Sequence, residues 1–413
     1  MPQVLYSLCV ALPVVNVNLM QKIPRTVVVL GAVSFFNDLA SDMVIPLIPL
    51  LLATELATGP IALGLIEGLA DALASFMKLW SGRFSDRLGG RRKGLAVAGY
   101  ALSNVVRPFF GAVSGWFGLL VLRSIDRFGK GIRSAPRDAM VADATEPGMR
   151  GVAFSFHRAL DNAGAVGGAL LAAAALAWST LSLREVIAWS IIPGAIGVAL
   201  LLFLVKEPPV TATRIAPQAS LSWSRLSINM RHYLLLLAWF TFARVSETFI
   251  VLRGHDLGMS TVSLLLLWAA LNLVKSLAAW WGGQAALRYG KEAVMVVSWS
   301  AYAVTFFLLS FASTPAIFCG ITLVYGVFAG LGEGIERALI SEFANDNERG
   351  TAYGWYNMMI GLTAIPAGLM FGGLWQWIGA WAAFSFAGCV AISAALVLHL
   401  RLAPALKLSS LTK

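Results

Sequence analysis

The feature that most constrains this chain is a series of long apolar runs that recurs through almost its whole length. Gly, Pro and charged residues separate twelve of them, at about 26–53, 61–82, 94–113, 116–133, 151–178, 185–205, 232–252, 261–282, 292–312, 315–336, 350–373 and 379–400. Most are close to the roughly 20 residues that an α-helix needs to cross a bilayer. Strand-like alternation with regular turn signals is absent, so we expect an all-α membrane protein with twelve transmembrane helices.

The composition fits a lipid environment and excludes several classes of protein. Of the 413 residues, 58% are hydrophobic and 13% are charged, whereas a typical soluble domain carries about 25% charged residues. So few charges cannot cover a water-soluble core of this size. We therefore exclude a soluble enzyme, a disordered scaffold and a nucleic-acid-binding protein, despite the net charge of +10. The three Cys residues are scattered, and we expect no zinc site, no disulfide framework and no cofactor.

The basic residues predict the orientation of the helices. With the N-terminus inside, 22 of the 31 Lys and Arg residues fall in cytoplasmic segments, and only Arg184 and Arg253 fall on the other side. The positive-inside rule then predicts a multi-pass protein of the plasma (inner) membrane with both termini cytoplasmic. Met20 looks like a natural start just before the first apolar run. We interpret residues 1–19 either as an over-extended reading frame or as a loose tail.

The chain divides into two halves of similar sequence. Arg150–His157 (RGVAFSFH) opens the fifth run, and Arg349–Tyr356 (RGTAYGWY) opens the eleventh. A Pro-containing polar segment separates the sixth run from the seventh. We therefore expect a tail at 1–25, a six-helix bundle at 26–205, a cytoplasmic linker at 206–231, a second six-helix bundle at 232–401 and a tail at 402–413. Parallel repeats of this kind are typical of transporters whose site lies between the halves.

A charged segment follows the second run and has the sequence GRFSDRLGGRRK, from Gly82 to Lys93. It resembles the loop 2–3 signature of the major facilitator superfamily with one additional Gly, and the resemblance covers the chain from about Leu19 onward. Further stretches resemble a poorly characterised prokaryotic branch of that superfamily: Asp38–Met43, Asp126–Arg133, Pro136–Asp138 and Phe156–Arg158. The resemblance implies two pseudo-symmetric six-helix bundles. It also implies a monomeric, proton-coupled transporter of a small molecule.

The same signature predicts a cytoplasmic gate made of Gly82, Asp86, Arg87, Gly89 and Arg91. Gly82 lets a neighbouring helix approach closely. Asp86, at the edge of the membrane, can pair with one of the two Arg residues or with a facing helix N-terminus. Such contacts would hold the two halves together while the protein is open to the outside. The alternative is that the basic residues serve only as positive-inside anchors.

Charged residues inside the apolar runs mark the predicted site. Each costs about 2.5–3.5 kcal/mol at the bilayer centre unless it faces water or a partner. Several lie three or four residues from an opposite charge, which places both on one helix face. The offsets suggest the pairs Arg123–Asp126, Arg158–Asp161, His157–Asp161, Arg244–Glu247 and Glu333–Arg337. We expect the proton-coupling and substrate cavity to comprise Asp38, Asp42, Glu67, Asp71, Lys78, Arg123, Asp126, Arg127, His157, Arg158, Asp161, Arg244, Glu247, Lys275 and Glu333. For part of this set, structural ion pairs between helices are the alternative.

Two acids of this set are candidates for proton coupling. Burial favours the protonated carboxylic acid and a nearby guanidinium favours the carboxylate, so such a pair can take up a proton on one side and release it on the other. We expect Asp42 or Asp126 to be the coupling acid, with Arg123 or Arg127 as the competing partner.

The expected function is proton-coupled efflux, by antiport, of an organic solute or drug. The segment Gly164–Gly168 (GAVGG) resembles, without its proline, a signature of superfamily exporters. The alternatives are proton-coupled import and transport of a metal ion or siderophore. Few His and Cys residues argue against a soft-metal site, although Asp38, Asp42 and His157 could form an oxygen-rich one. HExxH, GxSxG and phosphate-loop motifs are absent, so we expect neither an enzyme nor an ATP-driven pump.

Overall fold

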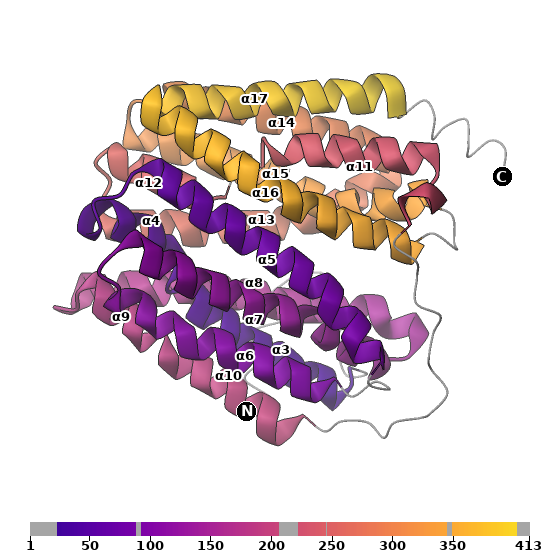
Figure 1. Cartoon of the computed structure of the whole chain (residues 1–413), viewed down its shortest axis with the longest axis horizontal. Helices are drawn as coiled ribbons and strands as arrows, with labels where there is room; N and C mark the ends of the chain where they lie inside the picture. Colours follow the sequence, from indigo (N-terminus) through magenta and orange to yellow (C-terminus); the bar gives the residue numbers. More distant parts are fainter. Residues whose placement is uncertain (1–22, 88–91, 206–221, 245, 345–348, 403–413) are drawn as a thin grey trace.

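The computed structural model describes residues 23–87, 92–205, 222–244, 246–344 and 349–402. Within these ranges all regular structure is helical, and the helices of the two halves of the chain form two bundles that lie side by side (Figure 1). The expected all-α class is therefore confirmed. The predicted tails lie almost entirely outside the described residues, and so does most of the predicted linker.

The helices of the first half match the six runs predicted there. They are α3 (Arg25–Asp42), α5 (Pro60–Arg87), α6 (Lys93–Val106), α7 (Trp116–Asp143), α8 (Arg150–Trp178), α9 (Leu183–Trp189) and α10 (Ile191–Leu204). After α3 the chain continues through the short turns η1 (Ile45–Leu47), α4 (Ile48–Leu50) and η2 (Leu51–Glu55). Pro46 and Pro49 lie at the start of two of these turns, where a missing backbone donor is tolerated. The turn η3 (Arg107–Ala112) extends α6.

The helices of the second half follow the same order. They are α11 (Ile228–Thr241), α12 (Thr248–Asp256), α13 (Thr261–Tyr289), α14 (Lys291–Phe311), α15 (Pro315–Phe343), α16 (Arg349–Trp377) and α17 (Ala380–Val397), with the turns η5 (Trp223–Arg225) before them and η6 (Leu398–Leu402) after them. The run predicted at 232–252 is not one helix, because α11 ends at Thr241 and α12 begins at Thr248. Irregular backbone at this depth is tolerated where it lines a polar cavity.

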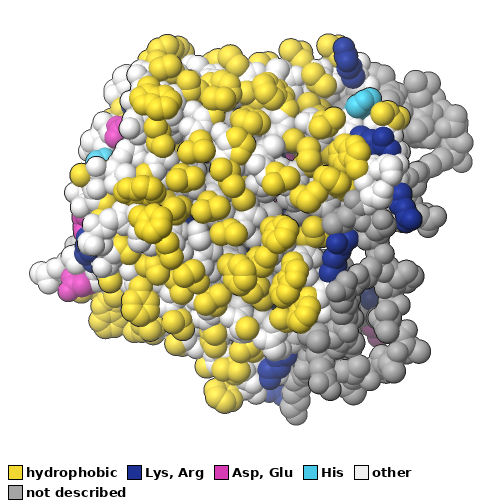
Figure 2. Space-filling view, in the orientation of Figure 1, with side chains coloured by type: hydrophobic (Ala, Val, Ile, Leu, Met, Phe, Trp, Pro, Cys, Tyr) yellow, Lys and Arg dark blue, Asp and Glu magenta, His cyan; other side chains and the backbone are white. Residues whose placement is uncertain are grey.

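Nine helical segments among the described residues are long and apolar enough to cross a membrane. The other three predicted spans correspond to α6 with η3, to α7, and to α11 with α12. These carry more charge within the run or are interrupted, and they are consistent with twelve spans. Apolar side chains cover the face seen in Figure 2, and basic side chains gather at its right-hand edge. We call the end of the bundles where α10 ends and η5 begins the linker end.

The two halves meet along two pairs of helices, α5 with α16 and α8 with α13. Glycines allow the first pair to touch backbone to backbone: a Cβ added at Gly64 would lie 2.0 Å from the carbonyl oxygen of Gly368, and one at Gly368 would lie 2.2 Å from that of Gly64. Further along, α4 packs against α12. These contacts join the halves at the end opposite the linker end.

The glycines of the exporter-like segment have a different role. A Cβ at Gly164 would lie 2.3 Å from the carbonyl oxygen of Phe35, and one at Gly168 would lie 2.3 Å from that of Leu39. Both glycines thus let α8 pack closely on α3 inside the first half.

Candidate functional site

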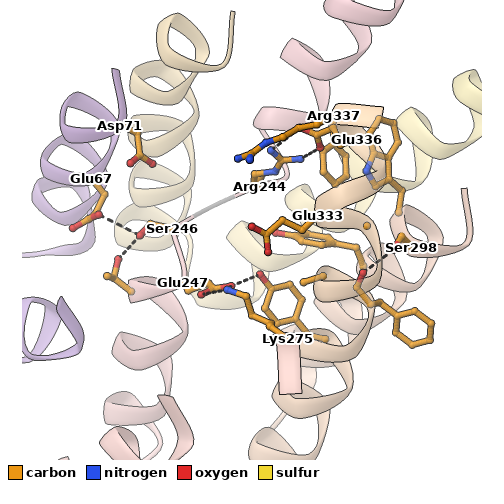
Figure 3. A pocket seen from close by; sticks show the side chains of 18 of the residues that line it. Glu67, Asp71, Arg244, Ser246, Glu247, Lys275, Ser298, Glu333, Glu336 and Arg337 are labelled. Atoms are coloured by element: carbon orange, nitrogen blue, oxygen red, sulfur yellow. Dashed lines mark hydrogen bonds and ion pairs between the residues drawn. The ribbon is translucent and has the colours of Figure 1, made fainter. Parts of the chain in front are cut away.

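A cavity of about 420 Å³ lies between the two halves, and Figure 3 shows many of the side chains that line it. In the first half the charged lining residues come from α5 and α7, and in the second half they come from α13, α15 and the break between α11 and α12. Five of the lining residues are acidic and five are basic: Glu67, Asp71, Glu247, Glu333, Glu336, Arg123, Arg127, Arg244, Lys275 and Arg337. The aromatic lining residues are Phe240, Trp268, Trp299, Tyr302, Tyr325, Phe328 and Tyr356.

Eight of the fifteen residues predicted for the cavity line it: Glu67, Asp71, Arg123, Arg127, Arg244, Glu247, Lys275 and Glu333. The other seven lie around it or within the first half: Asp38, Asp42, Lys78, Asp126, His157, Arg158 and Asp161. Among these, Lys78 lies on α5 beyond the cavity lining, towards the linker end.

The first-half wall is held by a buried ion-pair network. Arg123 is about 1% exposed, and its guanidinium donates to both carboxylate oxygens of Glu67 at 3.1 and 3.0 Å. Arg123 also contacts Asp126, three residues on, at 3.4 Å. Asp126 accepts a second hydrogen bond from Arg107 at 3.0 Å, and Asn37 and other polar groups hold that guanidinium in place. Both oxygens of Asp126 are therefore engaged by guanidinium groups.

Asp42 has a different environment. It is about 9% exposed, and its Oδ1 accepts a hydrogen bond of 2.9 Å from Nε1 of Trp268. This bond joins α3 of the first half to α13 of the second half. No ion pair involves Asp42 among the described residues. The neighbouring candidate Asp38 accepts a hydrogen bond of 2.7 Å from the side chain of Asn37.

The second-half wall pairs its charges across helices. The Lys275 ammonium lies 2.7 and 2.8 Å from the two oxygens of Glu247, and the Tyr325 hydroxyl donates to the same acid at 3.0 Å. Arg244 forms a bidentate pair with Glu336 instead of pairing with Glu247, as Figure 3 shows. The expected pairing of Arg244 with Glu247 is wrong because both residues lie in the break between α11 and α12. The helical geometry that an offset of three requires is absent there.

Three further polar contacts join the halves near the cavity. Ser246 donates to Glu67 at 3.4 Å (Figure 3), and Arg158 on α8 lies 3.3 Å from Glu333 on α15. Asn162 donates to Ser276 at 2.8 Å, which links α8 to α13. Glu333 thus finds its ion-pair partner in the opposite half, and not four residues away on its own helix.

A second polar cluster lies inside the first half, outside the cavity lining. Nε2 of His157 is 2.9 Å from the Ser34 hydroxyl, and its Nδ1 is 3.7 Å from Asp161. Arg137 adds contacts of 3.4 Å to Ser34 and 4.0 Å to Asp161. His157 therefore packs among α3, α7 and α8. Among the described residues no group of three or more His, Cys, Asp or Glu could hold a metal ion. The oxygen-rich metal site considered for Asp38, Asp42 and His157 thus has no geometric support.

The predicted gate falls mostly on residues that the structure does not describe. Gly89 and Arg91 lie outside the described residues, and Asp86 and Arg87 are described only as the last residues of α5. A Cβ added at Gly82 would meet the Ala135 side chain at 3.4 Å, an ordinary contact. The role of Gly82 in a cytoplasmic gate stays a prediction. Close approach between α5 and α7 occurs at Gly131, whose Cβ would lie 2.5 Å from that of Met77.

Sequence reasoning missed several residues of the site. Glu336 closes the predicted tenth run, and treating every intramembrane acid as a site candidate would have found it. Tyr325, Tyr356 and Trp268 gave no signal, because aromatic residues are common in membrane helices as packing and interface residues. The Tyr356 hydroxyl donates to Glu336 at 2.7 Å, so these aromatic residues complete the polar network.

Two related helical bundles with a charged cavity between them define the class of secondary transporters. Sequence comparison identifies the family: the model described as Major Facilitator Superfamily matches residues 30–284 and 248–412. The chain belongs to the Major Facilitator Superfamily. It is a multi-pass membrane transporter and not an enzyme.

Relatives in sequence agree with this assignment, and solved structures show the same fold. An uncharacterized MFS-type transporter of Methanocaldococcus jannaschii is 27% identical over 362 residues, which cover 86% of this chain and 90% of the relative. An uncharacterized protein of Mycobacterium bovis is 26% identical over 364 residues, covering 85% and 87%. The nucleoside transporter NupG superposes with a TM-score of 0.73 at 15% identity, covering 91% and 98% of the chains. The inward open xylose transporter XylE of E. coli superposes with a TM-score of 0.71 at 16% identity, covering 90% and 95%.

Proposed function

We propose that this chain is a proton-coupled antiporter that exports a small organic solute from the cytoplasm by alternating access. The observation that carries the proposal is the cavity between the halves, lined by paired charges and aromatic side chains. The cavity is complete within one chain, which supports a monomer as the working unit. The excess of basic residues at the linker end supports an orientation with both termini cytoplasmic.

The geometry supports Asp42 over Asp126 as the acid that takes up the proton. Asp126 is held by Arg107 and Arg123, and a carboxylate between two guanidinium groups has little tendency to bind a proton. Asp42 is buried. Among the described residues it has no ion-pair partner, and its carboxylate accepts one side-chain hydrogen bond, from Trp268 of the opposite half. Protonation of Asp42 would remove the charge from that hydrogen bond, which weakens it. Binding of a proton to Asp42 would thus weaken the contact between the halves that Asp42 and Trp268 form.

Import by the same coupling is the alternative function, because alternating access works in both directions. The resemblance of the segment Gly164–Gly168 to an exporter signature supports export. The close packing of these glycines on α3 gives the segment a structural role in either direction.

The Asp42→Asn variant is expected to lose proton coupling and to keep solute exchange. In inverted membrane vesicles with an imposed pH gradient, a panel of dyes, drugs and other organic solutes would identify a transported compound. The variant should then show no gradient-driven accumulation, since asparagine cannot carry the proton. Exchange of labelled for unlabelled solute without a gradient should continue at a rate within about tenfold of the wild type, because one buried side-chain change of equal size costs about 1 kcal/mol.

The matched control is Asp256→Asn at the end of α12, outside the cavity lining, which should transport like the wild type. Gradient-driven transport that survives in Asp42→Asn would contradict the assignment of this acid. A wild-type protein that moves no member of the panel in response to the gradient, in either vesicle orientation, would contradict proton coupling itself.

A further inference from the structure

Helices α5 and α7 run side by side in the same direction, because the residues in contact advance together along both helices. The Ser81 hydroxyl on α5 donates to the carbonyl oxygen of Gly131 on α7 at 3.0 Å, and Glu67 pairs with Arg123 nearer the opposite end. Position 67 of α5 thus lies level with position 123 of α7. We call this bidentate pair the closed rung.

The same register places a second acid and a second cation level with each other. Asp71 and Arg127 each lie four residues after a member of the closed rung, about 6 Å further towards the linker end. Both line the cavity. They form no ion pair with each other. In the closed rung, an acid on α5 and an arginine on α7 at the same separation of 56 residues do reach each other. We call Asp71 and Arg127 the open rung.

Neither member of the open rung has a hydrogen-bonded ion-pair partner among the residues that the structure describes. Asp71 has no hydrogen bond or ion pair to any described residue and is exposed to the cavity. The Arg127 side chain is about 9% exposed, and its one ion-pair contact among the described residues is 4.0 Å to Asp126. Closer guanidinium groups already occupy Asp126, and Nε of Arg127 is buried without a hydrogen-bond partner. A buried guanidinium with an unsatisfied donor is costly, so this arrangement points to a missing ligand.

The other charges of the cavity wall are satisfied. Glu247 has Lys275, Glu336 has Arg244, and Glu333 has Arg158. The remaining cation, Arg337, interacts with the Tyr356 hydroxyl. Because the lining holds equal numbers of acids and bases, its formal charge is zero. A solute with a net charge would leave an uncompensated charge in the cavity, whereas a neutral solute with two opposite charges would not.

We propose that the open rung binds a zwitterionic solute, with its ammonium group on Asp71 and its carboxylate on Arg127. The planar guanidinium fork matches a carboxylate bidentately, and an ammonium group donates to a single carboxylate. Aromatic side chains such as Phe240 and Trp299 line the same cavity and offer a surface for an apolar body. The cavity is large enough for an amino acid or a dipeptide, since ligand pockets start at about 300 Å³. This inference rests on the proposed function, which it extends to a substrate class.

The test is direct binding, measured without any gradient. Purified full-length protein in lipid nanodiscs would be titrated by calorimetry with sets of matched probes: aromatic and aliphatic amino acids and their dipeptides, the amides of each, and the N-acetyl derivatives of each. The amides keep only the cation and the N-acetyl forms keep only the anion. At least one zwitterion should bind at least tenfold more tightly than both of its singly charged derivatives, because each derivative leaves one member of the rung unpaired.

Two variants assign the preference to the rung. Arg127→Gln should bind the amide about as tightly as the zwitterion, because the guanidinium that would hold the carboxylate is gone. Asp71→Asn should bind the N-acetyl form about as tightly as the zwitterion, because the carboxylate that would hold the ammonium group is gone. The conservative change Arg127→Lys should keep part of the preference, since the positive charge stays. The matched controls are Arg288→Gln at the end of α13 and Asp256→Asn at the end of α12, both outside the cavity lining, and both should bind like the wild type.

The proposal is overturned if no zwitterion of the set binds, if singly charged probes bind wild type as tightly, or if folded rung variants keep the wild-type preference. Where a variant does not fold, the wild-type titrations alone decide. Binding of a zwitterion without proton-coupled flux would contradict the proposed function and leave this inference standing. Proton-coupled flux of solutes that are not zwitterions, without binding of any zwitterion, would support the proposed function and contradict this inference.

Discussion

Replacing Gly64 by valine is expected to abolish transport, because it forces the two halves apart at the end opposite the linker end. A Cβ at this position would lie 2.0 Å from the carbonyl oxygen of Gly368 and 2.7 Å from its carbonyl carbon. Backbone atoms cannot rotate away as a side chain can, so α5 and α16 must separate. Overpacking against backbone costs about 1.5–3 kcal/mol or more, which corresponds to a loss of closed protein of roughly tenfold or greater.

Two measurements would detect the separation of α5 from α16. The rate of solute exchange in proteoliposomes should fall at least tenfold. In a cysteine-free background, a cysteine at Ser246 should become accessible to a membrane-impermeant thiol reagent added from the end opposite the linker end. Gly368→Val should reproduce both effects, because the approach is reciprocal. Gly320→Val on α15 is the matched control, since its Cβ would meet nothing within 4 Å. Normal exchange in Gly64→Val would show that this contact does not close the protein.

Replacing Arg123 by methionine is expected to destabilise the protein by about 3–5 kcal/mol, because it leaves the buried Glu67 carboxylate without its cation. Arg123 is among the largest fully buried side chains and holds both Glu67 and Asp126. The free energy of unfolding, measured by denaturant titration in mixed micelles, gives the loss directly.

The double variant with Glu67→Gln added should recover part of this stability, because the unpaired charge is then gone. Arg288→Met is the control: this side chain is exposed near the end of α13 and lies over the ring of Tyr289. Its substitution should change stability by no more than about 0.5 kcal/mol. An Arg123→Met protein as stable as the wild type would refute the structural role of the network.

Much of the fold could be predicted from the sequence, because the bilayer imposes strict rules on length and hydropathy. The apolar runs predicted the helices to within several residues, except that α7 extends to Asp143 and the seventh run is broken. The break could not be read from hydropathy. Arg244 and Glu247 lie inside this short non-helical segment and bind partners on two other helices, α15 and α13.

The candidate site was predicted in composition but not in pairing. An offset of three within an unbroken helix correctly joined Arg123 to Asp126. The same rule failed for Glu333, which binds Arg158 of the other half. Spacing within one helix describes neighbours on that helix, whereas a buried charge takes the best partner that packing brings near it.

The sequence by itself determined that this chain spans a membrane as two related bundles, and which charged side chains lie inside the bilayer. It could do so because the cost of burying charge and unpaired backbone depends on local composition alone. Only the tertiary structure decided which charges neutralise one another and which face the cavity. Glu67 and Arg123 are 56 residues apart, and Asp42 and Trp268 are 226 apart. Their contacts depend on the register between separate helices, and the close approach of glycine backbones sets that register.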